Sequence, residues 1–357
     1  MVTLMVIPLL IASTISLGQP SDDEGFSDIY FAEKREDGLY NVICIDQSLE
    51  FGVSYEEITA GKVCQGGQTE NPLPNEPSYE SFLEYCKNTE KYPLEKPLIK
   101  ALKKEFQDTT CNDLASILPL EQSLSLSHYE IESLAPLYSF THFTVLHLDN
   151  NNIEDLTPLK KMTSLSTLKI SSNNITHLKG LKSLKNLSHL DASSNKILDV
   201  AGLEGLSRLI SLNLSRNLLT DLSSLSALNS LEKLVLSHNK LTNLRGLEFI
   251  DGLIELNVSY NDIVFLEELE NHEGLLFLVI SDNQIRDLTP IEHATNLLAL
   301  YIDNTKVTDL KPVANLQQLE RFSAQGIPLG DAAQKTPENC PDQGKIPQVL
   351  KEFCRFL

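Results

Sequence analysis

The sequence contains no tryptophan, few aromatic residues and a shortage of positive charge. Aromatic residues make up 6% of the 357 residues, and 29 Lys and Arg stand against 49 Asp and Glu, which gives a net charge of −20. A chain this acidic is repelled by phosphate backbones and anionic lipid headgroups, so we expect neither a nucleic-acid partner nor docking on a membrane surface. Beyond the first residues, no apolar run approaches the ~18 residues of a membrane-spanning helix, which argues against an internal span.

Residues 1–18 are uncharged and mostly apolar, and they give way abruptly to the acidic stretch QPSDDEG. A short apolar segment that ends in small residues before a polar sequel is typical of a secretory signal peptide. The usual positive charge at its start is missing, and Pro8 interrupts the segment. We expect a protein that is secreted or held in the periplasm or at the cell surface, with no membrane insertion after cleavage. An uncleaved anchor or a hydrophobic tail is the alternative.

Cysteine is absent from the whole stretch between residues 112 and 339. Six cysteines allow 15 pairings, and closing short loops favours three disulfides of the kind found in exported proteins. The pairs expected on this basis are Cys44–Cys64, Cys86–Cys111 and Cys340–Cys354. No C-x2-C pair exists, so a structural metal site is not expected. Six free thiols in an intracellular protein are the alternative.

A leucine-rich unit of 22 residues dominates the rest of the chain. It restarts without insertion at Phe143, Leu165, Leu187, Leu209, Leu231, Leu253, Leu275, Leu297 and Leu319. The template is LxxLxLxxNxIxDLxxLxxLxx, and a degenerate copy begins at Glu121. A fixed period in this range with this pattern predicts a solenoid of stacked repeats.

Each part of the template predicts a local structure. The LxL segment alternates with period two, which predicts a short strand whose leucines, such as Leu146 and Leu148, point inward. Later apolar residues of the unit, such as Ile153 and Leu156, fill the core from the convex side. One unit cannot bury these side chains alone, so it stacks on its neighbours.

One asparagine recurs in each unit, at Asn151, Asn173, Asn195, Asn217, Asn239, Asn261 and Asn283. Where the strand leaves the sheet, backbone groups lose their partners, and a buried amide that both donates and accepts hydrogen bonds can satisfy them. We therefore predict a structural role for this asparagine ladder rather than ligand binding. Thr305 and Ile327 replace the asparagine in the last two units, as expected of terminal repeats.

These units resemble the leucine-rich-repeat superfamily, and within it the 22-residue class shared by internalin-like bacterial surface proteins and phosphatase-regulator-like intracellular proteins. The resemblance covers roughly residues 111–330 and rests on the nine units together with the phrases DLTPL (155–159), DLTPI (287–291) and DLKPV (309–313). It implies an α/β fold, a right-handed solenoid with a concave parallel sheet, and a protein-binding role. The apolar N-terminus favours the secreted bacterial type.

The flanks are predicted to form separate parts. We divide the chain into a signal peptide (1–18), an acidic disulfide-stapled mini-domain with a linker (19–78), an N-terminal cap (79–120), the solenoid (121–330) and a C-terminal cap (331–357). Two short strands and a helical turn are expected in the mini-domain. The N-terminal cap is expected to hold two amphipathic helices that Pro93 and Pro97 break apart. Such caps cover the core at the ends of a stack.

The outward-facing positions of the strands vary while the frame does not. The N-terminal half of this surface is polar, whereas the C-terminal half gathers apolar and aromatic residues with polar ones beside them, which is typical of an interface hot spot. We predict that a protein partner contacts Lys233, Val235, Glu255, Asn257, Tyr260, Phe277, Val279 and Tyr301. Ordinary variation of an exposed face is the alternative.

No cofactor or catalytic motif occurs in the sequence. His147, His189 and Asp191 fall on nearby predicted strands, but positions two repeats apart are separated by about 10 Å, too far for one metal ion unless the side chains converge. We predict a non-catalytic, monomeric protein without cofactor or metal that binds another protein. Two alternatives stay open: an intracellular phosphatase-regulator-like scaffold, and a secreted effector whose residues 19–78 carry an activity.

Overall fold

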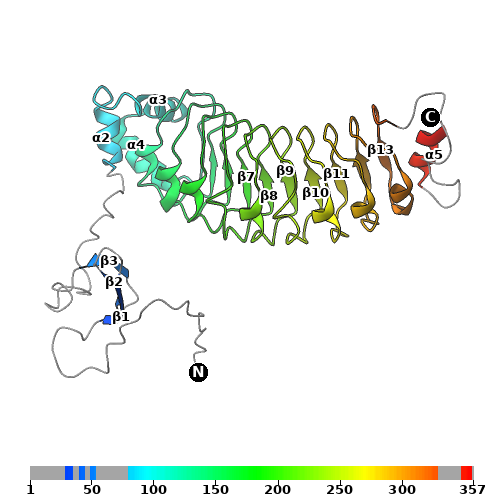
Figure 1. Cartoon of the computed structure of the whole chain (residues 1–357). Coiled ribbons are helices and arrows are strands. Elements are labelled where there is room, and N and C mark those ends of the chain that lie inside the picture. The colour runs from blue at the N-terminus through cyan, green and yellow to red at the C-terminus, as the bar shows by residue number, and fades with distance from the viewer. Residues whose placement is uncertain (1–28, 35–39, 45–48, 54–78, 329–346, 356–357) are drawn as a thin grey trace, which may run out of the picture. The chain divides into compact units, whose positions relative to one another are not determined.

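The computed structural model describes residues 29–34, 40–44, 49–53, 79–328 and 347–355 (Figure 1). The chain divides into two compact units, residues 1–77 and 78–357. Within the described segments, every helix is too short or too polar to traverse a bilayer.

The first unit contains a three-stranded antiparallel sheet in the order β1-β2-β3. Its strands are β1 (Ile29–Lys34), β2 (Tyr40–Cys44) and β3 (Leu49–Val53). The sequence predicts two strands and a helical turn. It does not predict β1, because the short apolar run at the start of this strand lies inside a strongly acidic segment. The expected helical turn lies outside the described residues.

Three short helices open the second unit: α2 (Phe82–Lys87), α3 (Lys96–Glu105) and α4 (Cys111–Ile117). The expectation of two helices is incomplete, because α4 follows a hydrophilic stretch and its sequence runs directly into the first repeat. Of the two prolines expected to separate the helices, Pro93 lies between α2 and α3, and Pro97 lies in the first turn of α3, where a missing N–H leaves no hydrogen bond unmade. These helices form the helical N-terminal cap that the sequence predicts.

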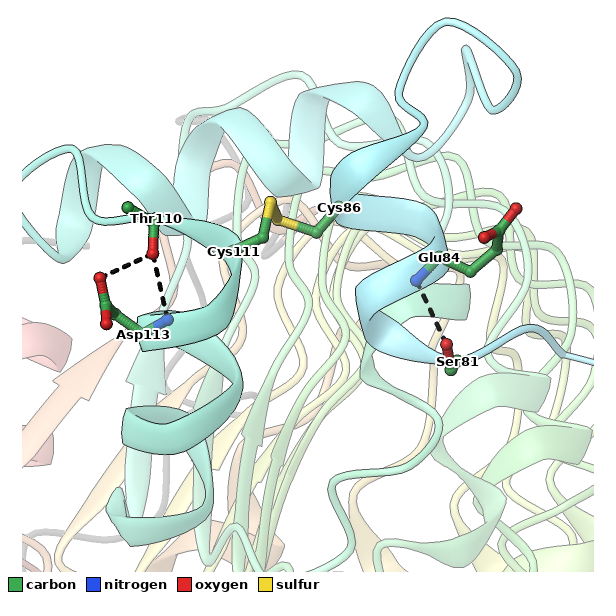
Figure 2. The surroundings of a disulfide bond; sticks show 6 residues. All are labelled: Ser81, Glu84, Cys86, Thr110, Cys111 and Asp113. Atoms are coloured by element: carbon green, nitrogen blue, oxygen red, sulfur yellow. Dashed lines mark hydrogen bonds between the residues drawn. A yellow bond between two sulfur atoms is a disulfide. The ribbon is translucent and has the colours of Figure 1, made fainter.

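A side-chain cap stabilises the start of α2 and another the start of α4, and a disulfide joins the two helices, as Figure 2 shows. The Glu84 amide donates to Ser81 Oγ at 3.2 Å, and the Asp113 amide donates to Thr110 Oγ1 at 3.3 Å. Cys86 in α2 and Cys111 at the start of α4 form a disulfide with a Cα–Cα distance of 5.7 Å.

No cysteine among the described side chains is free, and Cys354 is also disulfide-bonded. Cys64 and Cys340 lie outside the described residues, so the pairings Cys44–Cys64 and Cys340–Cys354 stay predictions.

The solenoid is built on one parallel sheet of ten strands in chain order. The strands are β4 (Ser123–Ser125), β5 (Val145–His147), β6 (Thr167–Lys169), β7 (His189–Asp191), β8 (Ser211–Asn213), β9 (Lys233–Val235), β10 (Glu255–Asn257), β11 (Phe277–Val279), β12 (Ala299–Tyr301) and β13 (Arg321–Ser323). Each residue pairs with the one 22 positions later, as in Glu255 with Phe277. The 22-residue period is therefore the register of the sheet, which forms the concave face.

Short 3₁₀ turns lie opposite the sheet on the convex face. They are η2 (Ala135–Leu137), η3 (Thr157–Lys161), η4 (Lys179–Leu181), η5 (Ser223–Leu225), η6 (Glu267–Leu269), η7 (Thr289–Ile291) and η8 (Lys311–Asn315), with η1 (Leu118–Leu120) following α4. The leucines of strands and turns form a continuous buried core, which confirms the predicted inward direction of residues such as Leu146 and Leu148.

The asparagine ladder connects each repeat to the one before it. Asn195 Nδ2 donates to the carbonyls of Ile170 at 2.9 Å and Ala192 at 3.1 Å, while its Oδ1 accepts from the Ile175 amide at 3.0 Å. The amide thus satisfies backbone groups of two adjacent repeats where strand pairing has ended. At 305, Thr305 Oγ1 donates to the Ile302 carbonyl at 2.8 Å within its own repeat.

The last strand is covered by α5 (Gln348–Arg355). Leu350 is fully buried, and the Phe353 ring meets the Phe322 ring of β13 edge-on, with centroids 5.1 Å apart. A short helix therefore closes the apolar end of the stack.

Candidate binding surface on the concave sheet

Two rows of side chains on β9 to β12 point away from the core and carry most of the predicted contact residues. Lys233, Glu255 and Phe277 occupy equivalent positions and pair in register. Since neighbouring strands lie about 4.8 Å apart, these side chains are direct neighbours. The second row contains Val235, Asn257, Val279 and Tyr301 in the same order.

The first row combines an ion pair with an exposed aromatic ring. Lys233 Nζ lies 2.7 and 2.8 Å from the two carboxylate oxygens of Glu255, and both side chains remain substantially exposed. Phe277, next to Glu255, is 37% exposed. Charged groups that neutralise each other beside an uncovered ring leave this part of the sheet with little net charge.

The second row is half-buried and mostly apolar. Asn257 is the polar member, and its Oδ1 accepts from the Ser259 amide at 3.0 Å and from Ser259 Oγ at 2.8 Å. This hydrogen bonding fixes the amide along its own strand. Val235, Val279 and Tyr301 therefore supply the surface on either side of a rigid polar group.

Tyr260 lies at the edge where the strands leave the sheet. Its backbone adopts a left-handed conformation (φ 56°), as does that of His238 one repeat earlier (φ 57°). Because the two residues are equivalent, their rings stack with centroids 4.2 Å apart and planes 6° from parallel. Tyr260 is 51% exposed, so the stack presents an aromatic edge to solvent.

Three apolar residues at the opposite edge of the sheet were not predicted from the sequence. Ile254, Leu276 and Leu298 directly precede β10, β11 and β12, and their backbones are linked in sequence by Leu276 N–H to Ile254 O and Leu298 N–H to Leu276 O, both 2.9 Å. Ile254 is exposed, and the other two are half-buried. The residue that directly precedes a strand is Thr144 before β5 and Ser166 before β6, but isoleucine or leucine before β10 to β12. This change from polar to apolar is the sequence signal that could have identified these residues.

One outward position of the sheet is not exposed. Ala299 occupies the place in β12 that is equivalent to Phe277 in β11, but it is buried. It pairs with Phe277 on one side and Arg321 on the other, so a single methyl group lies between two much larger side chains. Outward position on a strand therefore does not by itself give exposure.

The residues considered for metal or acid–base chemistry do not form a site. His147 pairs with Lys169, and Lys169 pairs with Asp191, so a lysine separates the two groups. Asp191 Oδ1 accepts from Ser193 Oγ at 2.7 Å, a structural use of that serine. Across the described residues, no group of three His, Cys, Asp or Glu side chains is placed to hold a metal ion.

Comparisons with known proteins agree with this architecture. A family model for the leucine rich repeat matches residues 141–197. An internalin from Listeria monocytogenes is 29% identical over 66% of this chain and 72% of its own, with a TM-score of 0.62. Internalin C2 from the same organism is 24% identical over 65% of this chain and 96% of its own, with a TM-score of 0.51.

A more distant structure shares the fold alone. It is the leucine-rich-repeat ectodomain of a plant membrane receptor kinase from Arabidopsis thaliana, solved in complex with CASPARIAN STRIP INTEGRITY FACTOR 2. Its identity is 19%, over 59% of this chain and 30% of its own, with a TM-score of 0.50. Among curated proteins, none matches the chain significantly in sequence.

Proposed function

Because the chain is a leucine-rich-repeat protein of the internalin-like class, we propose that it is an exported, non-catalytic protein that binds a protein partner through its concave sheet. A leucine-rich-repeat scaffold is typical of protein-binding proteins. The proposed contact residues are Lys233, Val235, Glu255, Asn257, Tyr260, Phe277, Val279 and Tyr301.

The observation that carries the proposal is the patch of apolar and aromatic side chains on β9 to β12. Phe277 is an exposed phenylalanine on a rigid strand, beside a neutralised ion pair. Aromatic groups held on regular structure lose little conformational entropy on binding, which favours them as hot spots. Ile254, Leu276 and Leu298 extend the apolar surface to the edge of the sheet, so a partner can bury a continuous strip.

Export is supported by the disulfide between Cys86 and Cys111 and by the apolar residues 1–18. Disulfides persist in oxidising compartments and are rare in the cytosol. This chemistry favours the exported protein over the intracellular scaffold, for which free thiols are expected.

The test compares two regions of the same sheet, with two positions changed in each. Phe277→Ala and Tyr301→Ala remove aromatic rings from the patch, whereas His147→Ala and Lys169→Ala change β5 and β6 in the polar half. A binding partner is first captured from extracellular material by photo-cross-linking from position 301. Its affinity for each purified variant is then measured by surface plasmon resonance.

We expect each aromatic variant to lose about tenfold or more in affinity, because truncating a hot-spot residue costs more than about 1–2 kcal/mol. The two polar-half variants should bind as the unaltered protein does. Equal affinity for all four variants would show that the partner does not use this patch.

A further inference from the structure

The convex face carries charges of opposite sign in separate turns. The basic turn, residues 178–186, presents Lys179, Lys182 and Lys185. The acidic turn, residues 266–274, presents Glu267, Glu270 and Glu273. All six side chains are exposed. In a chain with a net charge of −20, three lysines gathered on one turn are a local exception.

The two turns match position by position. Each lysine lies 88 residues, or four repeats, before the glutamate at the equivalent place, because η4 and η6 begin at equivalent residues. Midway between them is the central turn, residues 222–230, with the uncharged sequence LSSLSALNS. The charges of the basic turn and the acidic turn are therefore opposite in sign at equivalent distances from the central turn.

Within the part of the chain that the structure describes, these charges are not neutralised. Among the described residues, none of the six forms an ion pair within 4.0 Å. Lys185 Nζ lies 3.2 Å from the Gly205 carbonyl and 3.4 Å from the Glu204 carbonyl, and Lys182 attracts the Glu204 carboxylate only at longer range.

Neighbouring repeats add like charges to the acidic turn. Glu248 and Glu292 occupy the position of Glu270 in the repeats on either side. Such in-register neighbours repel one another, and a partner that brings positive charge would relieve this repulsion.

An exposed phenylalanine lies closer to the central turn than the charged turns do. Phe249 is 63% exposed, which is the highest exposure of any described aromatic side chain. The equivalent residue two repeats earlier is Gly205, which is exposed and has no side chain, and between the two lies exposed Ala227 in the central turn. Equal distances separate Phe249 and Gly205 from this alanine along the solenoid.

We propose that two copies of this chain pair through their convex turns, related by a two-fold axis that crosses the central turn. This two-fold axis lies in the plane of contact and is perpendicular to the long axis of the solenoid. It therefore places the convex turns of one copy against those of the other in reverse order. The basic turn of each copy then faces the acidic turn of the other, so the three-to-three charge match occurs twice.

The same symmetry brings Phe249 of each copy over Gly205 of the other, on both sides of the facing Ala227 residues. The arrangement has an uncharged centre with the Phe249 contacts beside it, and its opposite charges lie farther out, as in the polar rim of other protein interfaces. One kind of like-charged meeting is created, between Glu204 of one copy and Glu248 of the other, and it also occurs twice. Arg208 and Arg245 lie in the same turns as these glutamates. This arrangement replaces the monomer expected from the sequence, and it leaves the concave patch of both copies open to a partner.

Sedimentation velocity of the full chain, over a range of concentrations, tests the pairing. The unaltered protein should sediment as a dimer that dissociates on dilution. Lys182→Glu should raise the dimer Kd about tenfold or more, because symmetry repeats the unfavourable contact twice. Lys169→Glu, on the concave sheet, makes the same change in net charge and should leave the Kd unaltered. Glu270→Lys should weaken the dimer as Lys182→Glu does.

Mixing the two weakened variants gives the decisive measurement. A copy with Lys182→Glu and a copy with Glu270→Lys match each other at both contacts, so the mixture should regain dimers that neither variant forms alone. A protein that stays monomeric at the highest concentration would overturn the proposal. So would assemblies larger than two copies, equal effects of Lys169→Glu and Lys182→Glu, or no recovery on mixing.

Discussion

A histidine occupies a core position of the solenoid at residue 272. The equivalent residues in the preceding repeats are Met162, Leu184, Leu206, Leu228 and Ile250, all buried. His272 is itself only 2% exposed, and neither ring nitrogen reaches a hydrogen-bond partner. Burial lowers the pKa of His272 below its usual value of 6.5, partly offset by Asp251 and by the nearby carbonyls of Leu247, Ile250 and Leu269. The imidazole is therefore held neutral in the folded protein.

This burial predicts a specific loss of stability in acid. As the pH falls through about 6.5, the unfolded chain binds a proton at His272 while the folded protein does not, so unfolding becomes more favourable. Above that pH, the ionisation of His272 does not change the free energy of unfolding, and below that pH it lowers this free energy. His272→Leu removes the titrating group and should stabilise the protein by about 1 kcal/mol or more at pH 7.5, because no buried nitrogen is left unpaired.

Urea unfolding of both proteins at pH 7.5 and pH 5 measures the effect. All other titrating groups are the same in the unaltered protein and the variant. The difference in unfolding free energy between the two proteins therefore reports on His272 alone. This difference should be larger at pH 5 than at pH 7.5. A difference that does not change with pH would mean that His272 has the same pKa in the folded and the unfolded protein, so that burial does not lower it.

Single residues differ in how far the sequence determines them. The asparagine ladder could be predicted from spacing, because the need to satisfy turned-out backbone groups recurs identically in each repeat. The burial of Ala299 could not. It depends on the size of the side chains one repeat away, which is a property of the surface rather than of the local pattern.

At the scale of elements, most convex turns begin with the same cap. An Asp or Asn side chain accepts a hydrogen bond from the amide two residues later, at 2.8–3.1 Å. The capping residues are Asp155, Asp199, Asp221, Asn243, Asp287 and Asp309. In the turn that contains η6, the equivalent residue is Phe265, which is 60% exposed and cannot accept such a bond. This turn therefore lacks a cap that the other turns have, and an Asp at position 265 would supply it.

Phe265→Asp should stabilise the protein by about 1 kcal/mol, the usual contribution of such a cap. The restored carboxylate would accept a hydrogen bond from the Glu267 amide. Phe265→Ala is the matched control, because it also removes the exposed ring but supplies no acceptor. The two variants are compared by urea unfolding. Equal midpoints would show that the carboxylate does not cap this turn.

Elements outside the repeats were predicted less completely, for a physical reason. Within the solenoid, each strand and turn is specified by many equivalent copies, so a departure from the pattern in one copy does not obscure it. Strand β1 and helix α4 occur once, and each is short. Helix α4 had one local signal, the Thr110 cap with Asp113 three residues later, which resembles a capping box with aspartate in place of glutamate.

At the scale of the molecule, the solenoid is a one-dimensional stack in which each repeat contacts only its neighbours. The 22-residue period alone is enough to predict strand order, register and the concave face. The period does not determine which part of the concave face binds, because the repeat frame is the same along its whole length. The patch on β9 to β12 rests on the outward residues alone, and its role stays a prediction.

A one-dimensional stack should lose stability locally when one end is weakened. Leu350→Ala with Phe353→Ala removes the side chains by which α5 covers β13, while Cys354 is kept. Truncating one fully buried leucine costs about 2–5 kcal/mol. We expect amide hydrogen exchange to accelerate in β12 and β13 and to stay slow in β5 to β8, because the lost contacts reach only the adjacent repeats.

Leu98→Ala at the other end is the matched control. Leu98 lies in α3 and is fully buried in the N-terminal cap, so its truncation should accelerate exchange in β4 and β5 but not in β13. The two variants together then map how far stability is transmitted along the stack. If either variant accelerated exchange evenly from β4 to β13, the solenoid would unfold as one cooperative unit. In that case, dimer formation through the convex turns would slow amide hydrogen exchange at both ends of each copy.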